Sequence, residues 1–429
     1  MLWRKTMSMF SWRGFATAGI GGFMLGSDSG VIASALAQLK AASGAQEDLL
    51  ACVASASIAG VVLAMTFGGR LVDRLGRVAA LRFAAGLYLS FAPLVLLAPG
   101  AGVLLLAARV GAGAADGLLA MALGVYLTEN LPTAVRGKGA VISQFAQTFG
   151  NLAGGAVAFA LVSTVGSPAV SWRLCFLFAS LPAALFLVIT RGLSEVPRRV
   201  PAPTAAPSPG GAGRGTALLA CALGACFALT GIGIALDYSV LLLGRTGLPS
   251  AACGCADVTV KGANLVFTAL ALVFVERRGR VFLLKTGIAG LFLSFVLAAG
   301  VFAALERGIA PPSVAVGSVA AFALAALAAS FALGPGACTW LVLSEILPSA
   351  CRARALAASM LVYNLTAFTL MTFFFCGVGA VGVSGMFLCL AAAMSVYFVL
   401  VRRFVPETTG RTLAEIEEGG LHGQRAGAA

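Results

Sequence analysis

The most constraining feature of this chain is a pair of motifs that each occur twice. A Glu-x-x-Pro-x-x-x-Arg pattern begins at Glu129 and again at Glu345, and all three residues recur at one offset (345 − 129 = 216). A shorter stretch, Asp73-Arg74-Leu-Gly76-Arg77, is echoed by Glu276-Arg277-Arg278-Gly279-Arg280. Motifs repeated in the same order indicate an internal duplication. We therefore expect two structurally similar halves, each about 200 residues long.

The apolar content of the chain places these halves in a membrane. Sixty per cent of the residues are hydrophobic, 10% are charged, and the mean hydropathy is +0.98. A helix needs about 20 apolar residues to span a bilayer. Twelve runs of that kind are present, at residues 14–36, 51–72, 79–98, 102–125, 139–162, 172–190, 216–242, 257–276, 281–304, 314–342, 355–376 and 378–401. The sequence predicts an all-α membrane protein with twelve transmembrane helices.

The net charge of +13 would suggest nucleic-acid binding if it were evenly spread. Most Arg and Lys residues fall instead into every second loop and both termini, which is the pattern of cytoplasmic loops. We therefore expect cytoplasmic N- and C-termini and no nucleic-acid partner. The ten cysteines and the single histidine show no metal-ligand spacing, so we expect no metal and no cofactor. The plasma membrane is the favoured location, with an organelle membrane as the alternative.

One segment, residues 194–215, has the composition of a linker because five prolines and several glycines disfavour helix. It divides the chain into an N-terminal six-helix bundle (1–193) and a C-terminal six-helix bundle (216–405), and residues 406–429 form a cytoplasmic tail. Parallel repeats in an apolar chain are typical of secondary transporters.

Six motifs in order resemble those of the major facilitator superfamily, and in particular its sugar-porter branch. They are Gly69…Asp73-Arg74-Leu-Gly76-Arg77, the paired Glu-x-x-Pro-x-x-x-Arg motifs, Ser194-Glu195-Val-Pro197-Arg198, Pro406-Glu407-Thr-Thr-Gly410-Arg411, Gly26-Ser-Asp28-Ser-Gly30 and Gly334-Pro335-Gly336…Trp340. The resemblance implies two pseudo-symmetric bundles that work by alternating access. It also implies a sugar or polyol as the solute, the lipid bilayer as surroundings, and a functional monomer.

Charged residues at the predicted inner helix ends form candidate gates. The gating set is Gly69, Asp73, Arg74, Gly76, Arg77, Glu129, Arg136, Glu195, Glu276, Arg277, Arg280, Glu345 and Arg352. Opposite charges on the two bundles can latch when the bundles tilt together, and exposed pairs worth about 0–1 kcal/mol suit a latch that opens in every cycle. The alternative is that the arginines only anchor helix ends.

Two charges inside the predicted membrane region stand out, Asp28 in span one and Arg109 in span four. Inserting a charged residue at the middle of a membrane helix costs about 2.5–3.5 kcal/mol, so we expect each to have a partner or a function. Their positions along the two helices give similar depths, which predicts an ion pair. In proton-coupled sugar porters an acid here takes up the proton, whereas facilitative members tend to carry Asn. The alternative is that Asp28 and Arg109 form a static ion pair with no role in coupling.

Two other acidic residues lie in predicted spans, Asp116 and Asp237. Each is either a second ion site or a water-facing residue.

Polar residues on the predicted spans are candidates for solute binding. They are Gln144, Gln147 and Asn151 on one face of span five, Asn264 in span eight, Trp340 in span ten and Asn364 in span eleven. The alternative role of such amides is interhelical hydrogen bonding. The Gln-Gln-x-x-Gly-x-Asn pattern of sugar porters is absent from span seven, and so is the aromatic residue usual in span eleven. The C-terminal half thus offers fewer polar contacts than a hexose site needs.

These features favour a proton-coupled symporter of a monosaccharide or polyol. An uncoupled facilitator of another small organic solute and a transporter-like nutrient sensor remain as alternatives. No arrangement of nucleophile and base or of metal ligands supports an enzyme.

Overall fold

The computed structural model describes every residue except 1, 132, 194–211, 348–351 and 407–429. The side chains of residues 2–11, 133–138, 140, 212–214, 276 and 353 also lie outside the description. Within the described residues the regular structure is helical. The helices before residue 194 are α1 (Leu2–Ser43), α2 (Glu47–Leu75), α3 (Arg77–Leu97), α4 (Val103–Asn130), α5 (Thr133–Val165) and α6 (Pro168–Thr190). Those after residue 211 are α7 (Ala212–Ala228), α8 (Ile232–Asp237), α9 (Ser239–Gly244), α10 (Ser250–Arg278), α11 (Arg280–Glu306), α12 (Val314–Leu333), α13 (Pro335–Ile346) and α14 (Arg352–Phe404).

The prediction of twelve apolar helices is confirmed in the described part of the chain. Eleven segments are long and apolar enough to cross a membrane. The last of them, α14, breaks at Gly382 (φ 78°, ψ 167°) into two helices, which gives the twelfth crossing. Span seven is itself divided into α7, α8 and α9. Helix α7 begins at Ala212, so the helical part of the second half starts inside the range predicted for the linker.

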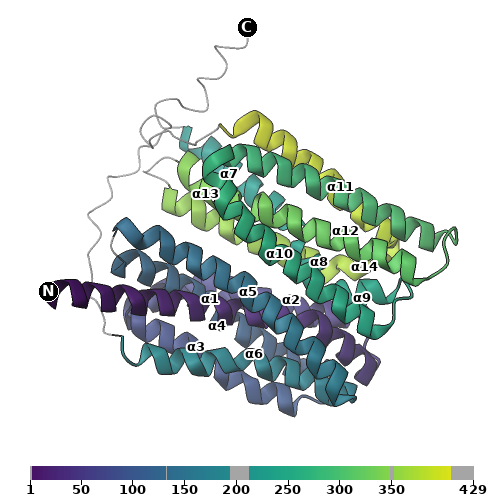
Figure 1. Cartoon of the computed structure of the whole chain (residues 1–429), viewed down its shortest axis with the longest axis horizontal. Coiled ribbons are helices and arrows are strands. Elements are labelled where there is room, and N and C mark those ends of the chain that lie inside the picture. Colours follow the sequence, from purple (N-terminus) through teal and green to yellow (C-terminus); the bar gives the residue numbers. More distant parts are fainter. Residues whose placement is uncertain (1, 132, 194–211, 348–351, 407–429) are drawn as a thin grey trace, which may run out of the picture.

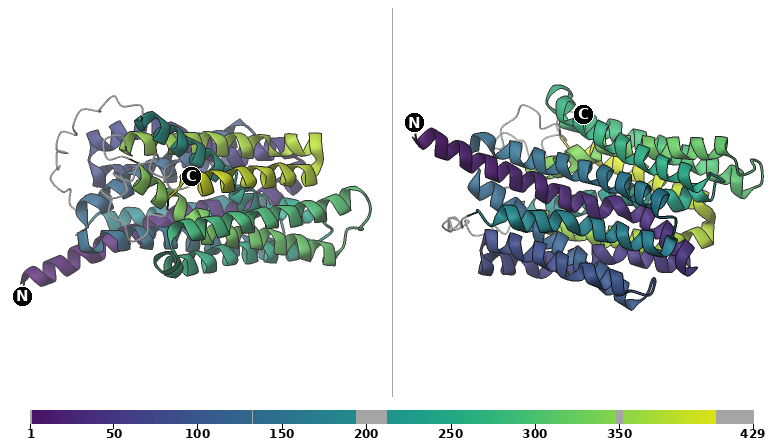
Figure 2. Two further views of the ribbon diagram at one scale, coloured as in Figure 1. Left: turned by 90° about the horizontal axis from the view of Figure 1, so that it is seen from above. Right: turned by 60° about the horizontal axis from the view of Figure 1, so that its bottom comes forward.

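The two halves of the duplication lie side by side (Figure 1). The first turns of α1 project beyond the neighbouring helices in both views of Figure 2. The repeat is visible in local detail, because α2 and α10 are each 29 residues long and each ends at a glycine. These glycines, Gly76 and Gly279, have φ of 93° and 90°, a conformation that side chains with a Cβ rarely adopt. The repeated motif therefore produces the same sharp turn in both halves, at Gly76 and at Gly279.

A stripe of glycines on α1 brings this helix into backbone contact with α5. A Cβ atom on Gly22, Gly26 or Gly30 would lie 2.2, 1.9 or 2.4 Å from a carbonyl oxygen of α5. Small residues spaced four apart are the usual device for close helix contact in membranes. The stripe fixes α1, and with it Asp28, against α5.

We call the end of the bundle that carries the repeated motifs the inner end, and the opposite end the outer end. At the outer end Glu47 of α2 contacts Arg245, the residue that follows α9 in the other half, and also accepts a hydrogen bond from Lys40 (2.7 Å). The Arg245 guanidinium lies 5.8 Å from the centre of the Phe375 ring. Deeper in the interface, Thr372 donates to Ser55 across the halves (2.7 Å). These contacts connect the two halves at the outer end.

The glycine stripe predicts the effect of one added methyl group. Gly26→Ala places a Cβ against the α5 backbone and should destabilise the folded protein by about 1–3 kcal/mol. Gly86→Ala is the matched control, because nothing lies within 4 Å of the added atom, and it should be neutral or stabilising by up to about 1 kcal/mol. Thermal unfolding in detergent measures both. Equal melting temperatures for the two variants would contradict the close contact.

The outer ion pair predicts a shift in the conformational equilibrium. Glu47→Gln removes the charge that binds Arg245, so outward-open molecules should increase by up to about fivefold, the range expected for a partly exposed pair. Distances between spin labels at the outer ends of α2 and α9 measure the two populations. Asp48→Asn, a neutralised carboxylate on the exposed side of the same turn, is the control and should leave the distances unchanged. A Glu47→Gln distribution identical to wild type would exclude the latch.

Candidate functional site

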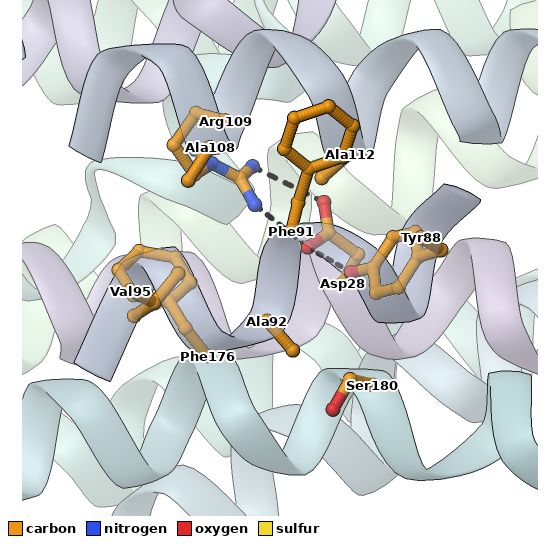
Figure 3. Close-up of a pocket in the computed structure, with 10 residues that line it drawn as sticks. All are labelled: Asp28, Tyr88, Phe91, Ala92, Val95, Ala108, Arg109, Ala112, Phe176 and Ser180. Carbon is orange, nitrogen blue, oxygen red and sulfur yellow. Dashed lines mark hydrogen bonds and ion pairs between the residues drawn. The ribbon is translucent and has the colours of Figure 1, made fainter. Parts of the chain in front are cut away.

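Asp28 and Arg109 form an ion pair inside the N-terminal half (Figure 3). The two guanidinium nitrogens donate to the two carboxylate oxygens at 2.7 and 3.1 Å. The Tyr88 hydroxyl of α3 donates to the same carboxylate at 2.6 Å. The Arg109 guanidinium also lies 5.1 Å from the centre of the Phe176 ring. Four helices, α1, α3, α4 and α6, therefore supply the site.

The pair is withdrawn from solvent, with side-chain exposures of 3% for Arg109 and 6% for Asp28. Removing one partner of a buried ion pair costs about 3–5 kcal/mol, because the other charge is left uncompensated. A cavity of about 20 Å³ lies beside the pair and is lined by Phe91, Val95 and Ser180 among others (Figure 3). This volume is sufficient for a single water molecule. A single water molecule can thus lie beside the carboxylate.

Asp116 belongs to the same group of charges. It lies two helical turns from Arg109 on α4, and it interacts electrostatically with both Asp28 and Arg109. Its Oδ1 atom is buried and makes no hydrogen bond to another described residue. The N-terminal half thus holds one ion pair and one additional carboxylate.

The three amides predicted on α5 have different surroundings. Gln144 and Gln147 are exposed, and neither makes a side-chain hydrogen bond within the described part of the chain. Asn151 is buried and donates to the Ser29 hydroxyl of α1 at 3.0 Å, while its Oδ1 has no partner among described residues. Gln144 and Gln147 are therefore free to meet a solute, and Asn151 connects them to α1.

The C-terminal half presents an aromatic cluster around Trp340. The rings of Trp340, Phe227 and Tyr363 lie with their centres 5.2–5.7 Å apart. Tyr363 is in the first part of α14, which is span eleven, so this span contributes an aromatic ring to the cluster. The tyrosine lies one position before Asn364, and a shift of one residue rotates a side chain by about 100° around the helix.

Two further predicted binding residues lie in helix contacts. Asn364 is buried, donates to the Met360 carbonyl at 2.8 Å, and lies 3.3 Å from the Met65 sulfur of α2 in the other half. Asn264 is buried on α10, and its carbonyl accepts a hydrogen bond from Thr268 at 2.7 Å. Within the described residues, neither makes a side-chain hydrogen bond to an amide of α5.

The described gate charges at the inner end pair within their own halves. Arg77 donates to both oxygens of Glu129, at 2.8 and 3.0 Å, and lies 3.2 Å from Asp73. In the second half Arg280 lies 3.3 Å from Glu345, at the position that the repeat predicts. This arrangement accompanies a closed outer end.

Several members of the predicted gating set make other contacts or fall outside the description. Arg352 donates to the Leu347 carbonyl at 3.0 Å. Gly69 has open space around it, while Arg74 and Arg277 are exposed. The Glu195 residue and the side chains of Arg136 and Glu276 lie outside the described residues. A latch that joins the two halves at the inner end stays a prediction.

Sequence analysis missed Tyr88 and Phe176, which complete the surroundings of the ion pair. Tyr88 is one of only five tyrosines in the chain, and a tyrosine within a predicted span is a signal, since its hydroxyl needs a partner there. Phe176 gives no comparable signal, because the chain has 28 phenylalanines and nearly every predicted span contains at least one.

Comparison with known proteins is consistent with this geometry. The family model described as "Sugar (and other) transporter" matches residues 15–198 and 210–419. The glucose transporter GlcP of Staphylococcus epidermidis is 26% identical over 94% of this chain and 96% of that protein. The D-xylose-proton symporter of Escherichia coli is 27% identical over 93% of this chain and 94% of that protein.

Solved structures agree with the fold. A crystal structure of D-xylose-proton symporter matches with a TM-score of 0.81 at 24% identity, over 94% of this chain and all of the other. The inward-open conformation of the xylose transporter XylE from Escherichia coli matches with a TM-score of 0.78 at 26% identity, over 95% of this chain and 99% of the other. The protein is an integral, multi-pass membrane protein and belongs to the sugar transporter family of the major facilitator superfamily.

Proposed function

We propose that the protein is a proton-coupled symporter that carries a monosaccharide or polyol across the plasma membrane by alternating access. The observation that carries this proposal is the buried contact between Asp28, Arg109 and Tyr88. A charged side chain inside the membrane costs free energy, so such residues usually have a function. Proton relays are among those functions.

The coupling follows from the charges of the pair. When the outer end is open, a proton neutralises Asp28 and weakens its attraction to Arg109, so Arg109 is free to turn toward other acceptors. Closing of the outer end and opening of the inner end then give the neutral carboxyl group access to the inner side. There the proton leaves, the ion pair forms again, and the empty protein returns. The described arrangement, with a closed outer end and an intact pair, corresponds to the step after proton release.

The solute class is supported by the groups available in each half. Gln144 and Gln147 offer neutral donors and acceptors, which suit hydroxyl groups. Trp340 and Tyr363 offer aromatic faces for the C–H surface of a sugar ring. Two relatives are named a glucose transporter and a D-xylose-proton symporter. The two glutamines and the asparagine of the span-seven pattern are absent from the segment Phe227-Ala-Leu-Thr230-Gly231-Ile-Gly233. We therefore expect a solute with fewer hydroxyl contacts than a tightly bound hexose.

Uptake into proteoliposomes tests the proposal directly. A panel of labelled hexoses, pentoses, polyols and inositol is offered with and without an inwardly directed proton gradient. Accumulation of at least one sugar or polyol above its outside concentration, only with the gradient, is the expected result. Equilibration without accumulation would identify an uncoupled facilitator, and binding without any uptake would identify a sensor.

Asp28→Asn separates the coupled step from the transport path. The amide cannot release a proton or form the ion pair with Arg109, so the empty protein cannot return and net accumulation should be lost. Solute exchange does not need that return, so counterflow should continue. Monodisperse elution in detergent shows that the variant folds, and Asp48→Asn is the exposed control. Undiminished accumulation by Asp28→Asn would refute the role given to this residue.

A further inference from the structure

A reciprocal contact joins α5 of the N-terminal half to α10 of the C-terminal half. A Cβ atom on Gly155 of α5 would lie 2.7 Å from Cδ of Lys261 on α10. In the opposite direction, a Cβ atom on Gly254 of α10 would overlap the Phe159 ring of α5. Each helix therefore supplies one glycine and one large side chain, and each large side chain fills the space beside the glycine of the other helix.

The Lys261 side of this contact is held in place by a buried ion pair. The Lys261 ammonium donates to Oδ2 of Asp257 at 2.5 Å, and both side chains have 0% exposure. The Ser239 hydroxyl of α9 donates to the other carboxylate oxygen, also at 2.5 Å. A fully buried lysine is rare and must be compensated. Because its ammonium is fixed by Asp257, the Lys261 side chain has little freedom to move away from Gly155.

A cavity of about 510 Å³ lies between the two halves at the outer end. Its lining comes from α1 and α5 of the first half and from α9 and α10 of the second, and it includes Phe159 and Gly254. Gly155, Asp257 and Lys261 are not part of this lining. On the α5–α10 side, the contact between Phe159 and Gly254 therefore forms the inner limit of the cavity, and the ion pair lies behind it.

Helix α9 connects this contact to the ion pair at the outer surface. Ser239 is the first residue of α9 and binds Asp257. Arg245 directly follows α9 and contacts Glu47 of the first half. Only the six residues of α9 separate the two contacts along the chain. Separation of the two halves at the outer end therefore breaks the Glu47–Arg245 pair at the surface and the reciprocal contact below it.

Alternating access requires the outer ends of the two halves to separate in every cycle. On separation, Phe159 and Lys261 leave the glycines that they cover, and the Asp257–Lys261 pair comes into contact with water. On closing, the pair is buried again without a net charge, because its two members neutralise each other. We propose that Phe159 and Lys261 form an outer gate, which Gly155 and Gly254 allow to close. This inference rests on the alternating access of the proposed function.

Gly254→Ala tests the gate, because its methyl group overlaps the Phe159 ring only when the halves are together. Overpacking of this size shifts an equilibrium by about 5-fold to 150-fold. The ratio of outward-open to outward-closed molecules should therefore rise within that range. Distances between spin labels at the outer ends of α5 and α10 measure this ratio, without solute and without a proton gradient. Gly262→Ala is the matched control on α10, because the nearest atom, on Leu152 of α5, is 4.0 Å away, and it should leave the ratio unchanged.

Phe159→Ala in the Gly254→Ala background provides a rescue. The ring that the added methyl group meets is then absent, so the ratio should return toward the wild-type value. A general loss of packing would instead make the double variant more open than Gly254→Ala alone. Gly155→Ala adds the methyl group on the first half and should raise the ratio in the same direction. It replaces Gly254→Ala if that variant does not elute as a monodisperse species.

The amine of Lys261 reports exposure of the buried pair. Mass spectrometry measures its reaction with a water-soluble amine reagent, and Lys40, whose side chain is 44% exposed, is the internal reference. Lys261 should react slowly in wild type and in Gly262→Ala. It should react at least about fivefold faster in Gly254→Ala, in proportion to the outward-open molecules.

The outcomes separate this inference from the proposed function. Equal ratios for Gly254→Ala and Gly262→Ala, or a double variant as open as Gly254→Ala, overturn the gate. A shift in the distances without faster reaction of Lys261 overturns the part given to the ion pair. The expected shifts in a protein that shows no solute uptake leave the gate intact and overturn the symport. Outward-closed distances alone, in wild type and in every variant, overturn both.

Discussion

A charge inside a membrane protein must be balanced, and that requirement determines how the N-terminal half is built. Asp28 and Arg109 balance each other at 2.7 and 3.1 Å, and Tyr88 donates a further hydrogen bond to the carboxylate. The three residues come from three helices, so those helices must hold a fixed rotation and depth relative to one another. The burial that makes the pair costly to break also makes it sensitive to a single proton, since protonation removes half of the interaction.

The glycine stripe of α1 also helps to fix the position of Asp28. Gly22, Gly26 and Gly30 allow the α1 backbone to lie against α5. Asp28 is on the same stretch of α1, while Asn151 of α5 reaches back to the Ser29 hydroxyl. A displacement of α5 would therefore be carried to the helix that bears Asp28. This direct backbone contact offers a physical connection between the amides of α5 and the charge pair.

Much of the fold could be predicted from the sequence, because apolar runs and repeated motifs are one-dimensional signals. The depths of Asp28 and Arg109 were also accessible, since helical rise converts residue number into distance. The rotation of each helix about its own axis could not be predicted from the sequence. This rotation determines that Tyr363 contacts Trp340 while Asn364 contacts Met65. The Asp257–Lys261 pair, by contrast, was accessible from the sequence, because a spacing of four residues puts both side chains on one face of a helix. The contact of Gly155 with this pair was not accessible.

The contacts of Glu47 have a consequence for what happens when the halves separate at the outer end. This carboxylate holds Arg245 of the opposite half and Lys40 of its own half at the same time. Loss of Arg245 would leave Glu47 still paired with Lys40, so the carboxylate would not be left alone. Dissolved salt screens partly exposed pairs, so it weakens the attraction between Glu47 and Arg245 and favours the separated arrangement.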